Sequence, residues 1–295
     1  PARGSEADQV RVPGHADESG VRKGAVIVAS RAAGNILMQL DGPGEGAGFG
    51  SSLCLIGDLD GDYKKDLVVG SPGLAVGARK SVGAIWIYRS SAGALELLMA
   101  GTCEGGRLGQ DVSLAADYDS DGVSELLVGE PGALNGDRDG QTEEWAGRVV
   151  VFAINSRKTL FTISTPELQS SYDHGANALG QDGFGSLTQL VQDVNADHVA
   201  DILVAYPLGY IEGGNKGVVN VFSGADRELI LETSWCDEIF PIPFRFGTSV
   251  TSIGDVDGDG VMDLAIGAAG DFGGIQLYSC GKRRSISHIR GDENL

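Results

Sequence analysis

Four short apolar runs recur along the chain, and each directly follows a loop rich in aspartate. The runs are Leu67–Gly70, Leu126–Gly129, Ile202–Ala205 and Leu264–Gly267. A second apolar segment that begins with Gly follows each run, at Gly83–Tyr88, Gly147–Phe152, Gly217–Phe222 and Gly274–Tyr278. Short runs of Val, Ile and aromatic residues between Gly and Pro are typical of β-strands. Because no segment of ten or more residues has a helical period, the pattern predicts an all-β chain.

Two further strands complete each repeat. One precedes the acidic loop and begins after a large apolar residue and a Gly, at Phe49-Gly50, Leu108-Gly109, Phe184-Gly185 and Phe246-Gly247. The other closes the repeat, as at Leu95–Ala100 and Leu229–Thr233. Four short antiparallel strands per repeat are the arrangement of a β-propeller blade. The apolar run Leu53–Ile56 favours a first strand that packs between neighbouring blades.

The repeats divide the chain into one partial blade and four full blades, all within one propeller domain. Residues 1–42 are expected to form a loop and the outer half of a blade, in which residues 2–23 are the loop. The full blades are expected at residues 43–102, 103–165, 166–235 and 236–295, with insertions at 131–146 and 165–182. The alternatives are a five-bladed ring that lacks residues at its seam and a piece of a larger ring. Because repeat proteins expose apolar edges unless closed or capped, the larger ring is favoured.

Charge and cysteine content exclude some classes of function. The net charge of −19, from 22 basic and 41 acidic residues, argues against a surface for nucleic-acid phosphates. No apolar run approaches the roughly 20 residues of a membrane span. The cysteines form no C-x-x-C pair, so a zinc or redox motif is not indicated, and a disulfide between Cys103 and Cys236 stays open.

The acidic loops carry the candidate chemistry. In each loop, positions 1, 3, 5 and 9 offer side-chain oxygens and position 7 offers a main-chain carbonyl, so five or six oxygens can surround one cation. This number and flexibility favour Ca²⁺ over Mg²⁺, and up to four Ca²⁺ ions are expected. A helix–loop–helix site is excluded, because each loop runs into a β-type segment and no Glu stands at position 12.

The predicted ligands follow this spacing in four loops. They are Asp58, Asp60, Asp62, Lys64 and Asp66 in loop 1; Asp117, Asp119, Asp121, Val123 and Glu125 in loop 2; Asp193, Asn195, Asp197, Val199 and Asp201 in loop 3; and Asp255, Asp257, Asp259, Val261 and Asp263 in loop 4.

The loops differ at two positions. Position 6 suits Gly, because a positive φ is expected there, but it is Tyr63 in loop 1 and His198 in loop 3. Asn195 also lowers the charge of loop 3. We therefore expect loop 4 to bind most tightly and loop 3 most weakly, and acidic turns without a metal stay open as the alternative. A fifth candidate with the same spacing is Asn135–Glu143, for which a solvated acidic loop is the alternative.

Phe49-Gly50, the loop Asp58–Asp66 and Gly70-Ser71-Pro72 together resemble the FG-GAP repeat of integrin alpha subunits and related secreted proteins. The resemblance extends over residues 24–42 and 48–290. It implies calcium in the loop between the first two strands of each blade, on the lower face, with partners on the upper face. The family usually has seven blades, which supports the larger ring. Leu108, Ala205 and Ala269 depart from the motif and weaken individual blades only.

The leading functional interpretation is a non-enzymatic, calcium-stabilised adhesion or protein-interaction scaffold, extracellular or on the cell surface. A protein or glycan partner is expected on the face opposite the calcium loops. The alternative is the propeller of a calcium-dependent carbohydrate-binding protein or polysaccharide lyase, for which Trp145, Tyr172 and His174 are the modest candidates. The four His residues show no catalytic spacing, and the tripeptide Arg290-Gly291-Asp292 is attributed to chance because the repeat already explains its Gly.

Overall fold

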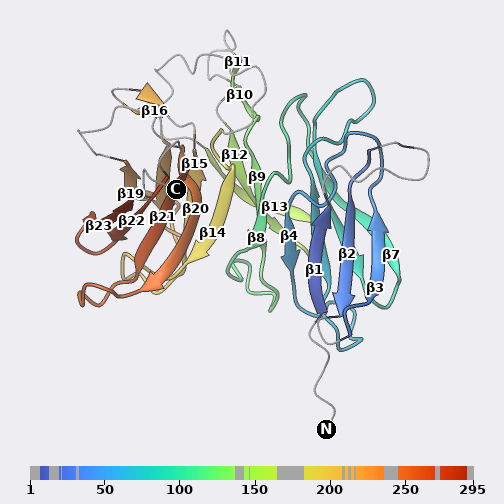
Figure 1. The fold of residues 1–295 in the computed structure, drawn as a ribbon, viewed down its shortest axis with the longest axis horizontal. Coiled ribbons are helices and arrows are strands. Elements are labelled where there is room, and N and C mark those ends of the chain that lie inside the picture. The colour runs from blue at the N-terminus through green and yellow to red at the C-terminus, as the bar shows by residue number, and fades with distance from the viewer. Residues whose placement is uncertain are drawn as a thin grey trace. The chain divides into compact units, whose positions relative to one another are not determined.

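The computed structural model consists of strands joined by turns and loops (Figure 1). It describes residues 7–12, 20, 22–30, 33–136, 143–145, 147–164, 183–207, 210–211, 214–215, 217–235, 245–269 and 273–290. Within these ranges there is no helix, so the prediction of an all-β chain is confirmed.

Four sheets of four antiparallel strands are the blades of a β-propeller, and the strands of each blade follow one another in chain order. Blade 1 contains β4 (Leu53–Leu55), β5 (Leu67–Ser71), β6 (Ala84–Arg89) and β7 (Ala94–Ala100). Blade 2 contains β8 (Val112–Leu114), β9 (Leu126–Glu130), β12 (Arg148–Ala153) and β13 (Lys158–Ser164). Blade 3 contains β14 (Leu187–Val191), β15 (Asp201–Tyr206), β18 (Val218–Phe222) and β19 (Leu229–Ser234). Blade 4 contains β20 (Arg245–Gly254), β21 (Asp263–Ala269), β22 (Gly274–Ser279) and β23 (Arg284–Arg290).

The N-terminal sheet has one strand more than the sequence predicted. Its strands are β1 (Ala7–Val12), β2 (Ala25–Ser30) and β3 (Ile36–Asp41). The expectation that residues 2–23 form only a loop is therefore wrong, because β1 pairs with β2 from Ala7 opposite Ser30 to Val12 opposite Ala25. The physical reason is that β2 would otherwise leave the main-chain groups of one edge unpaired.

Two small hairpins extend the connections between second and third strands. In blade 2, β10 (Leu134–Gly136) pairs with β11 (Glu143–Trp145), inside the insertion that the sequence placed at residues 131–146. In blade 3, β16 (Tyr210–Ile211) pairs with β17 (Gly214–Asn215). The insertion at residues 165–182 lies outside the described residues.

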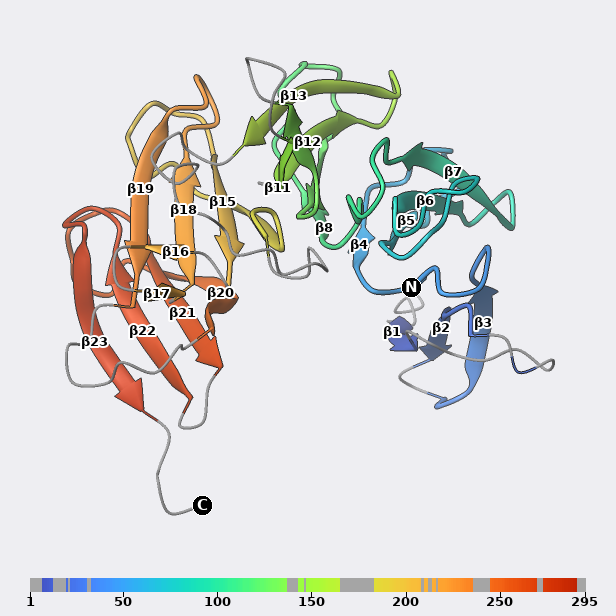
Figure 2. The same cartoon turned by 90° about the horizontal axis from the view of Figure 1, so that it is seen from above.

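The chain forms two compact units, residues 1–112 and 113–295. In unit 1, Val26 of the N-terminal sheet packs with Phe49, Leu67 and Val69 of blade 1. In unit 2, one core cluster joins blades 2 and 3 and another joins blades 3 and 4, and Figure 2 shows these last two blades side by side. The interior of each unit therefore lies between sheets.

The large residue and the Gly ahead of each acidic loop have separate roles. Phe49, Leu108, Phe184 and Phe246 are all at most 1% exposed, so each fills the core beside its blade. The glycines that follow have φ values of 85°, 81°, 91° and 88° at Gly50, Gly109, Gly185 and Gly247. Residues with a Cβ rarely adopt this conformation, so the pair combines a core anchor with a turn that needs Gly.

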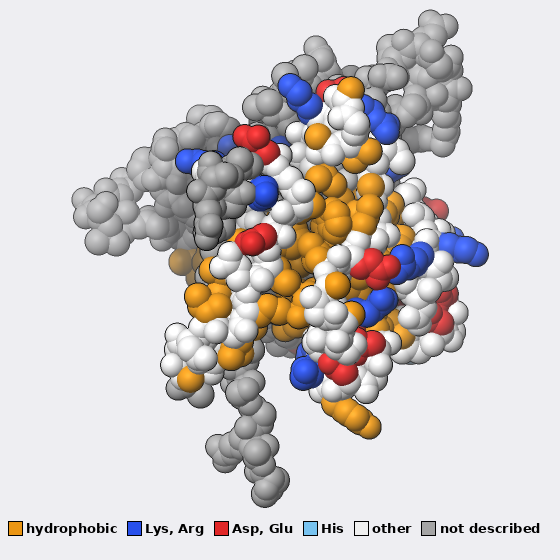
Figure 3. Space-filling view, turned by 90° about the vertical axis from the view of Figure 1, so that its right-hand side faces the viewer, with side chains coloured by type: hydrophobic (Ala, Val, Ile, Leu, Met, Phe, Trp, Pro, Cys, Tyr) orange, Lys and Arg blue, Asp and Glu red, His pale blue; other side chains and the backbone are white. Residues whose placement is uncertain are grey.

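Some apolar side chains of unit 1 remain uncovered. Ile36 and Leu37 of β3 are 61% and 51% exposed, and Leu97 of β7 is 43% exposed. Figure 3 views the side that lies on the right in Figure 1 and shows hydrophobic side chains gathered in the middle of this face. Unit 1 thus presents apolar surface to its surroundings.

Candidate metal centres

Each acidic loop connects the first and second strands of its blade. Its base is closed by main-chain hydrogen bonds across the two strand ends. In loop 1 the Ile56 amide donates to the Asp66 carbonyl at 3.0 Å, and in loop 2 the Ala115 amide donates to the Glu125 carbonyl at 2.8 Å. Position 9 therefore stands at the point where the hairpin begins, and the other ligand positions lie in the turn above it.

The carboxylate at position 1 accepts hydrogen bonds from several main-chain amides of the turn. Asp58 accepts hydrogen bonds from the amides of Gly61, Asp62 and Tyr63, at 2.7, 3.2 and 2.7 Å. Asp117, Asp193 and Asp255 accept equivalent bonds in the other loops. Although burial acts in the opposite direction, these amides together lower the pKa of Asp58. The position therefore favours an ionised carboxylate even without a cation.

Two residues of every loop have a left-handed main chain. At position 6, φ is 66° for Tyr63, 87° for Gly122, 70° for His198 and 87° for Gly260, which confirms the expected positive φ. Position 4 shares this conformation, at Gly61, Ser120, Ala196 and Gly258. Loops 1 and 3 thus adopt the same path as loops 2 and 4 in spite of their bulky residues at position 6.

The carboxylate at position 5 links the loop to the turn between the third and fourth strands. One oxygen accepts the amide of position 7, at 2.8 or 2.9 Å in every loop. The other accepts a side-chain donor from this turn or the strand end beside it, which is Ser90, Asn155, Ser223 or Ser279 in loops 1 to 4. In loop 1, the Ser90 hydroxyl is the main cause that lowers the pKa of Asp62. The sequence analysis missed these donors, because they lie well over ten residues beyond the loops.

The carboxylate at position 9 is almost completely buried in every loop: Asp66, Asp201 and Asp263 are 0% exposed and Glu125 is 1% exposed. Each accepts the amide of position 2, as the Tyr118 amide donates to Glu125 at 2.6 Å. Burial raises the pKa of Glu125 and of Asp201. A bound cation would offset this unfavourable burial of negative charge.

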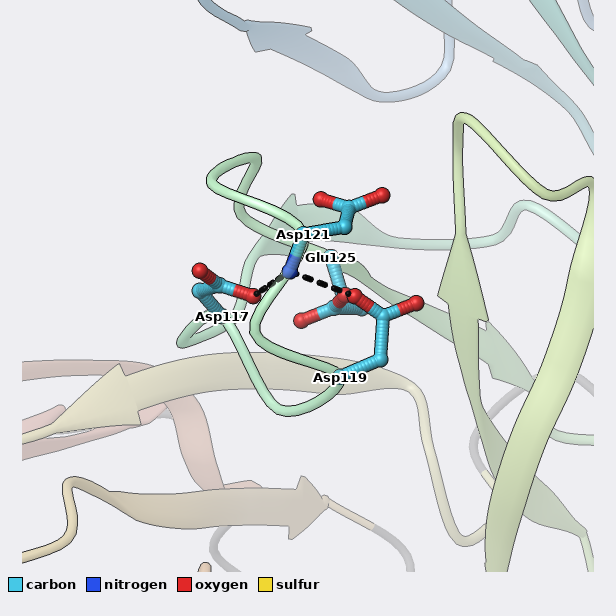
Figure 4. A group of neighbouring side chains, drawn as sticks. All are labelled: Asp117, Asp119, Asp121 and Glu125. Carbon is cyan, nitrogen blue, oxygen red and sulfur yellow. Dashed lines mark hydrogen bonds between the residues drawn. The ribbon is translucent and has the colours of Figure 1, made fainter.

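The carboxylates converge in three of the loops. Oxygens of Asp117, Asp119, Asp121 and Glu125 all lie within 4.8 Å of one another in loop 2, and Figure 4 shows these side chains around the Asp121 amide, which donates to Asp117 and Asp119. In loops 1 and 4 the residues at positions 1, 3 and 5 converge in the same way.

Loop 3 differs from the others at position 3. The Asn195 amide group turns its Nδ2 to Asp197 at 2.8 Å, and this hydrogen bond is the main cause that lowers the pKa of Asp197. Among the described residues, no cluster of three acidic, His or Cys side chains is found in this loop. Loop 3 therefore has the weakest geometric case for a cation, and its expected rank as the weakest binder stays a prediction.

The residues fit a hard divalent cation. The ligand positions offer oxygens, which suit Ca²⁺ better than the softer metals that select thiolate or imidazole. In loop 4, Oδ1 of Asp263 is buried and has no hydrogen-bond partner among the described residues. A buried carboxylate oxygen of this kind is unfavourable unless something positive lies beside it.

Several other candidates lie outside what the structure describes. Residues 137–142 are not described, so the fifth candidate site at Asn135–Glu143 stays an untested prediction. Tyr172, His174, Gly291 and Asp292 are also outside the described residues, as is the side chain of Trp145. The main chain of Arg290 ends β23.

Comparison with known proteins finds similarity to the FG-GAP repeat family and to integrin alpha subunits. The FG-GAP repeat family matches residues 246–278, which lie in blade 4 and include loop 4. Integrin alpha-2 of Bos taurus is 33% identical over 188 residues, which cover 61% of this chain and 14% of that protein. Integrin alpha-IIb of Homo sapiens is 31% identical over 225 residues, covering 76% of this chain and 20% of that protein. Integrin alpha-5 of Xenopus laevis is 29% identical over 228 residues, covering 75% and 20%.

The chain thus carries FG-GAP repeats in an integrin-like propeller, which confirms the resemblance read from the motifs. The matched regions are at most a fifth of the length of these relatives. No helix among the described residues is long and apolar enough to cross a membrane.

Proposed function

We propose that this chain is the calcium-stabilised, non-catalytic propeller of an extracellular or cell-surface adhesion protein. The observation that carries the proposal is the convergence of carboxylates in loops of one repeated geometry, above all Asp117, Asp119, Asp121 and Glu125. Similarity to integrin alpha subunits supports an adhesive role and this location. When bound, Ca²⁺ supplies positive charge to the oxygens at positions 1, 3, 5, 7 and 9.

The role of the loops in this proposal is structural. Positions 1 and 9 hold the turn and the hairpin base, while position 5 ties the loop to the next turn through donors such as Ser223, 3.1 Å from Asp197. Carboxylates held this close repel one another, and that repulsion opposes the fold. Ion binding would therefore add its free energy to folding.

A protein partner would bind on the face opposite the acidic loops. In an antiparallel blade, the connection between second and third strands lies at the end opposite the connection between first and second. The hairpins β10–β11 and β16–β17 belong to the former, and Figure 1 shows β10, β11 and β16 together at the upper end of unit 2. Such extended connections suit recognition, because loops vary without disturbing the sheets. The carbohydrate-binding and lyase alternative stays an untested prediction.

Calcium removal tests this function. Excess chelator is expected to lower the melting temperature by roughly 5–10 °C per site lost, because saturation at a hundred times Kd is worth about 2.7 kcal/mol per site. Differential scanning calorimetry with and without chelator measures this, and restored Ca²⁺ should reverse it. Magnesium at equal concentration is the control and should restore less. A melting curve that chelator leaves unchanged would contradict the proposal.

A further inference from the structure

A lysine reaches into loop 4 from a separate turn. Lys282 lies in the turn between β22 and β23, and its Nζ is 2.9 Å from Oδ1 of Asp257, the position-3 residue of loop 4. The same Nζ is 3.3 Å from the main-chain oxygen of Asp257. The Lys282 side chain is 39% exposed and that of Asp257 is 13% exposed. The ammonium group thus pairs with the loop while the Lys282 side chain as a whole stays partly exposed.

Loop 4 attracts positive charge for reasons that do not depend on this lysine. Asp255, Asp257 and Asp259 converge within 4.8 Å, as in loop 1. The fully buried Asp263 faces the loop, since its Oδ2 accepts the amides of Val256 and Asp257 at 2.7 and 3.3 Å. Its Oδ1 has no hydrogen-bond partner within the described part of the chain. Loop 4 therefore combines converging carboxylates with a buried carboxylate oxygen that has no hydrogen-bond partner among the described residues, and both features favour a bound cation.

The turn that carries Lys282 has a counterpart in every blade. Each turn has a left-handed residue one or two positions before the fourth strand begins, and these are Gly93, Arg157, Arg227 and Arg283, with φ between 51° and 72°. The residues immediately before them are Ala92, Ser156, Asp226 and Lys282. Blade 4 is thus the one of the four with a cation at this place. In blade 3, where Asn195 replaces a carboxylate, the place is held by an anion.

We propose that Lys282 is a built-in counter-ion of loop 4, which competes with a divalent cation for Asp257. The inference deepens the proposed function and depends on calcium binding by these loops. In the calcium-free protein the ammonium group offsets part of the repulsion among the three converging carboxylates. When Ca²⁺ binds, the ammonium must leave or lie close to a like charge, and both alternatives weaken binding. Loop 2, which has four converging carboxylates and the neutral Asn155 beside it, lacks this competitor.

This inference changes the expected order of affinity. From the ligand residues alone, loop 4 ranks first, and that order has not been tested. With Lys282 in place, loop 4 should bind Ca²⁺ more weakly than loop 2. Loop 4 should also be the better ordered of the two in the absence of Ca²⁺, because one of its carboxylates is already paired.

A site-resolved calcium titration tests the role of Lys282. Glycine amides report on separate loops: Gly258 and Gly260 in loop 4, whose amides donate to Asp255, and Gly122 in loop 2, whose amide donates to Asp117. The full chain labelled with ¹⁵N-glycine is titrated with Ca²⁺ as wild type, Lys282→Met and Lys282→Arg. Methionine keeps the apolar stem and removes the charge, whereas arginine keeps the charge.

The expected result is a specific shift at loop 4. Lys282→Met should lower the Ca²⁺ midpoint of Gly258 and Gly260 by about tenfold, because a like charge near 4 Å is removed. The Gly122 midpoint should not move, and Lys282→Arg should resemble wild type. The calcium-free melting temperature of Lys282→Met should fall. Equal loop 4 midpoints in wild type and Lys282→Met would overturn the inference while leaving calcium binding intact. If no glycine amide responds to Ca²⁺ in any variant, both this inference and the proposed function are overturned.

Discussion

Loops 2 and 4 have the same spacing of four carboxylates and the same main-chain path, but different neighbours. At position 6 both have Gly with φ of 87°. In loop 2, Glu125 joins the other three carboxylates within 4.8 Å, and a neutral amide from Asn155 reaches the cluster. In loop 4, three carboxylates converge and the ammonium group of Lys282 pairs with Asp257.

From this difference we expect that ligand spacing alone does not set the affinity of a cation loop. Main-chain geometry fixes where the oxygens point, and it is shared by all four loops. In loop 4, the positive charge that these oxygens meet comes from the turn between the third and fourth strands, which is a separate part of the sequence. Each of the following substitutions alters either the main-chain geometry of a loop or the polar and charged groups in and around it.

The largest effect is expected from removing the buried charge at position 9. In saturating Ca²⁺, Glu125→Gln should lower the free energy of unfolding by about 2–3 kcal/mol, the stabilisation that one occupied site gives at a hundred times Kd. Without Ca²⁺ the same change should be neutral or slightly stabilising, since burial raises the pKa of Glu125 and so opposes its ionised form. Urea denaturation with and without Ca²⁺ measures both values.

Asp263→Asn provides the comparison in loop 4. In saturating Ca²⁺, this change should lower the free energy of unfolding by less than Glu125→Gln does, because Lys282 already weakens Ca²⁺ binding by loop 4. The idea that position 9 acts through a cation would fail if Glu125→Gln destabilised the protein equally in both conditions.

A smaller effect, equal in loops 2 and 4, is expected from substitutions that disturb their shared main-chain geometry. A Cβ added at Gly122 or Gly260 meets no atom within 4 Å, so Gly122→Ala and Gly260→Ala should differ from wild type only through the positive φ. That conformation costs about 1 kcal/mol for alanine, and thermal melting should show a decrease of a few degrees in each variant. Gly57→Ala is the matched control, because Gly57 also has open space around its Cα and lacks a positive φ. Clearly unequal losses at Gly122 and Gly260 would show that the two loops differ in geometry as well as in charge.

The smallest effect is expected from the neutral links between loop and turn. Asn155→Ala removes the 3.0 Å bond from Nδ2 to Asp121, and Ser279→Ala removes the 3.1 Å bond from Oγ to Asp259. Each bond contributes about 0.5–1.5 kcal/mol. Ser279→Ala should have the larger effect, because Ser279 is 0% exposed and its hydroxyl also accepts the Lys282 amide. Chemical denaturation measures both, with Ser156→Ala in the same turn as Asn155 as the control. A larger loss for Asn155→Ala would contradict this ranking.

Much of the fold and of the site could be predicted from local patterns. The apolar runs after each loop are β5, β9, β15 and β21, and the Gly-led segments are β6, β12, β18 and β22. A positive φ was expected at position 6, and Tyr63 and His198 adopt it although this conformation suits Gly. The strand β1 and the hairpins β10–β11 and β16–β17 were not predicted, because they form where a neighbouring strand or loop is available and have weak patterns of their own.

The sequence by itself determined the all-β repeat, the position of each acidic loop and the oxygen type of its candidate ligands. These properties depend on residues close together in the chain: the strands follow from short apolar runs, and the loops from the spacing of acidic residues in one turn. The tertiary structure decided which charges meet. The register of the third strand against the second brings Asn155 to Asp121 and places the turn of Lys282 beside Asp257. Electrostatic interaction depends on distance in space, and only the paired sheets set that distance.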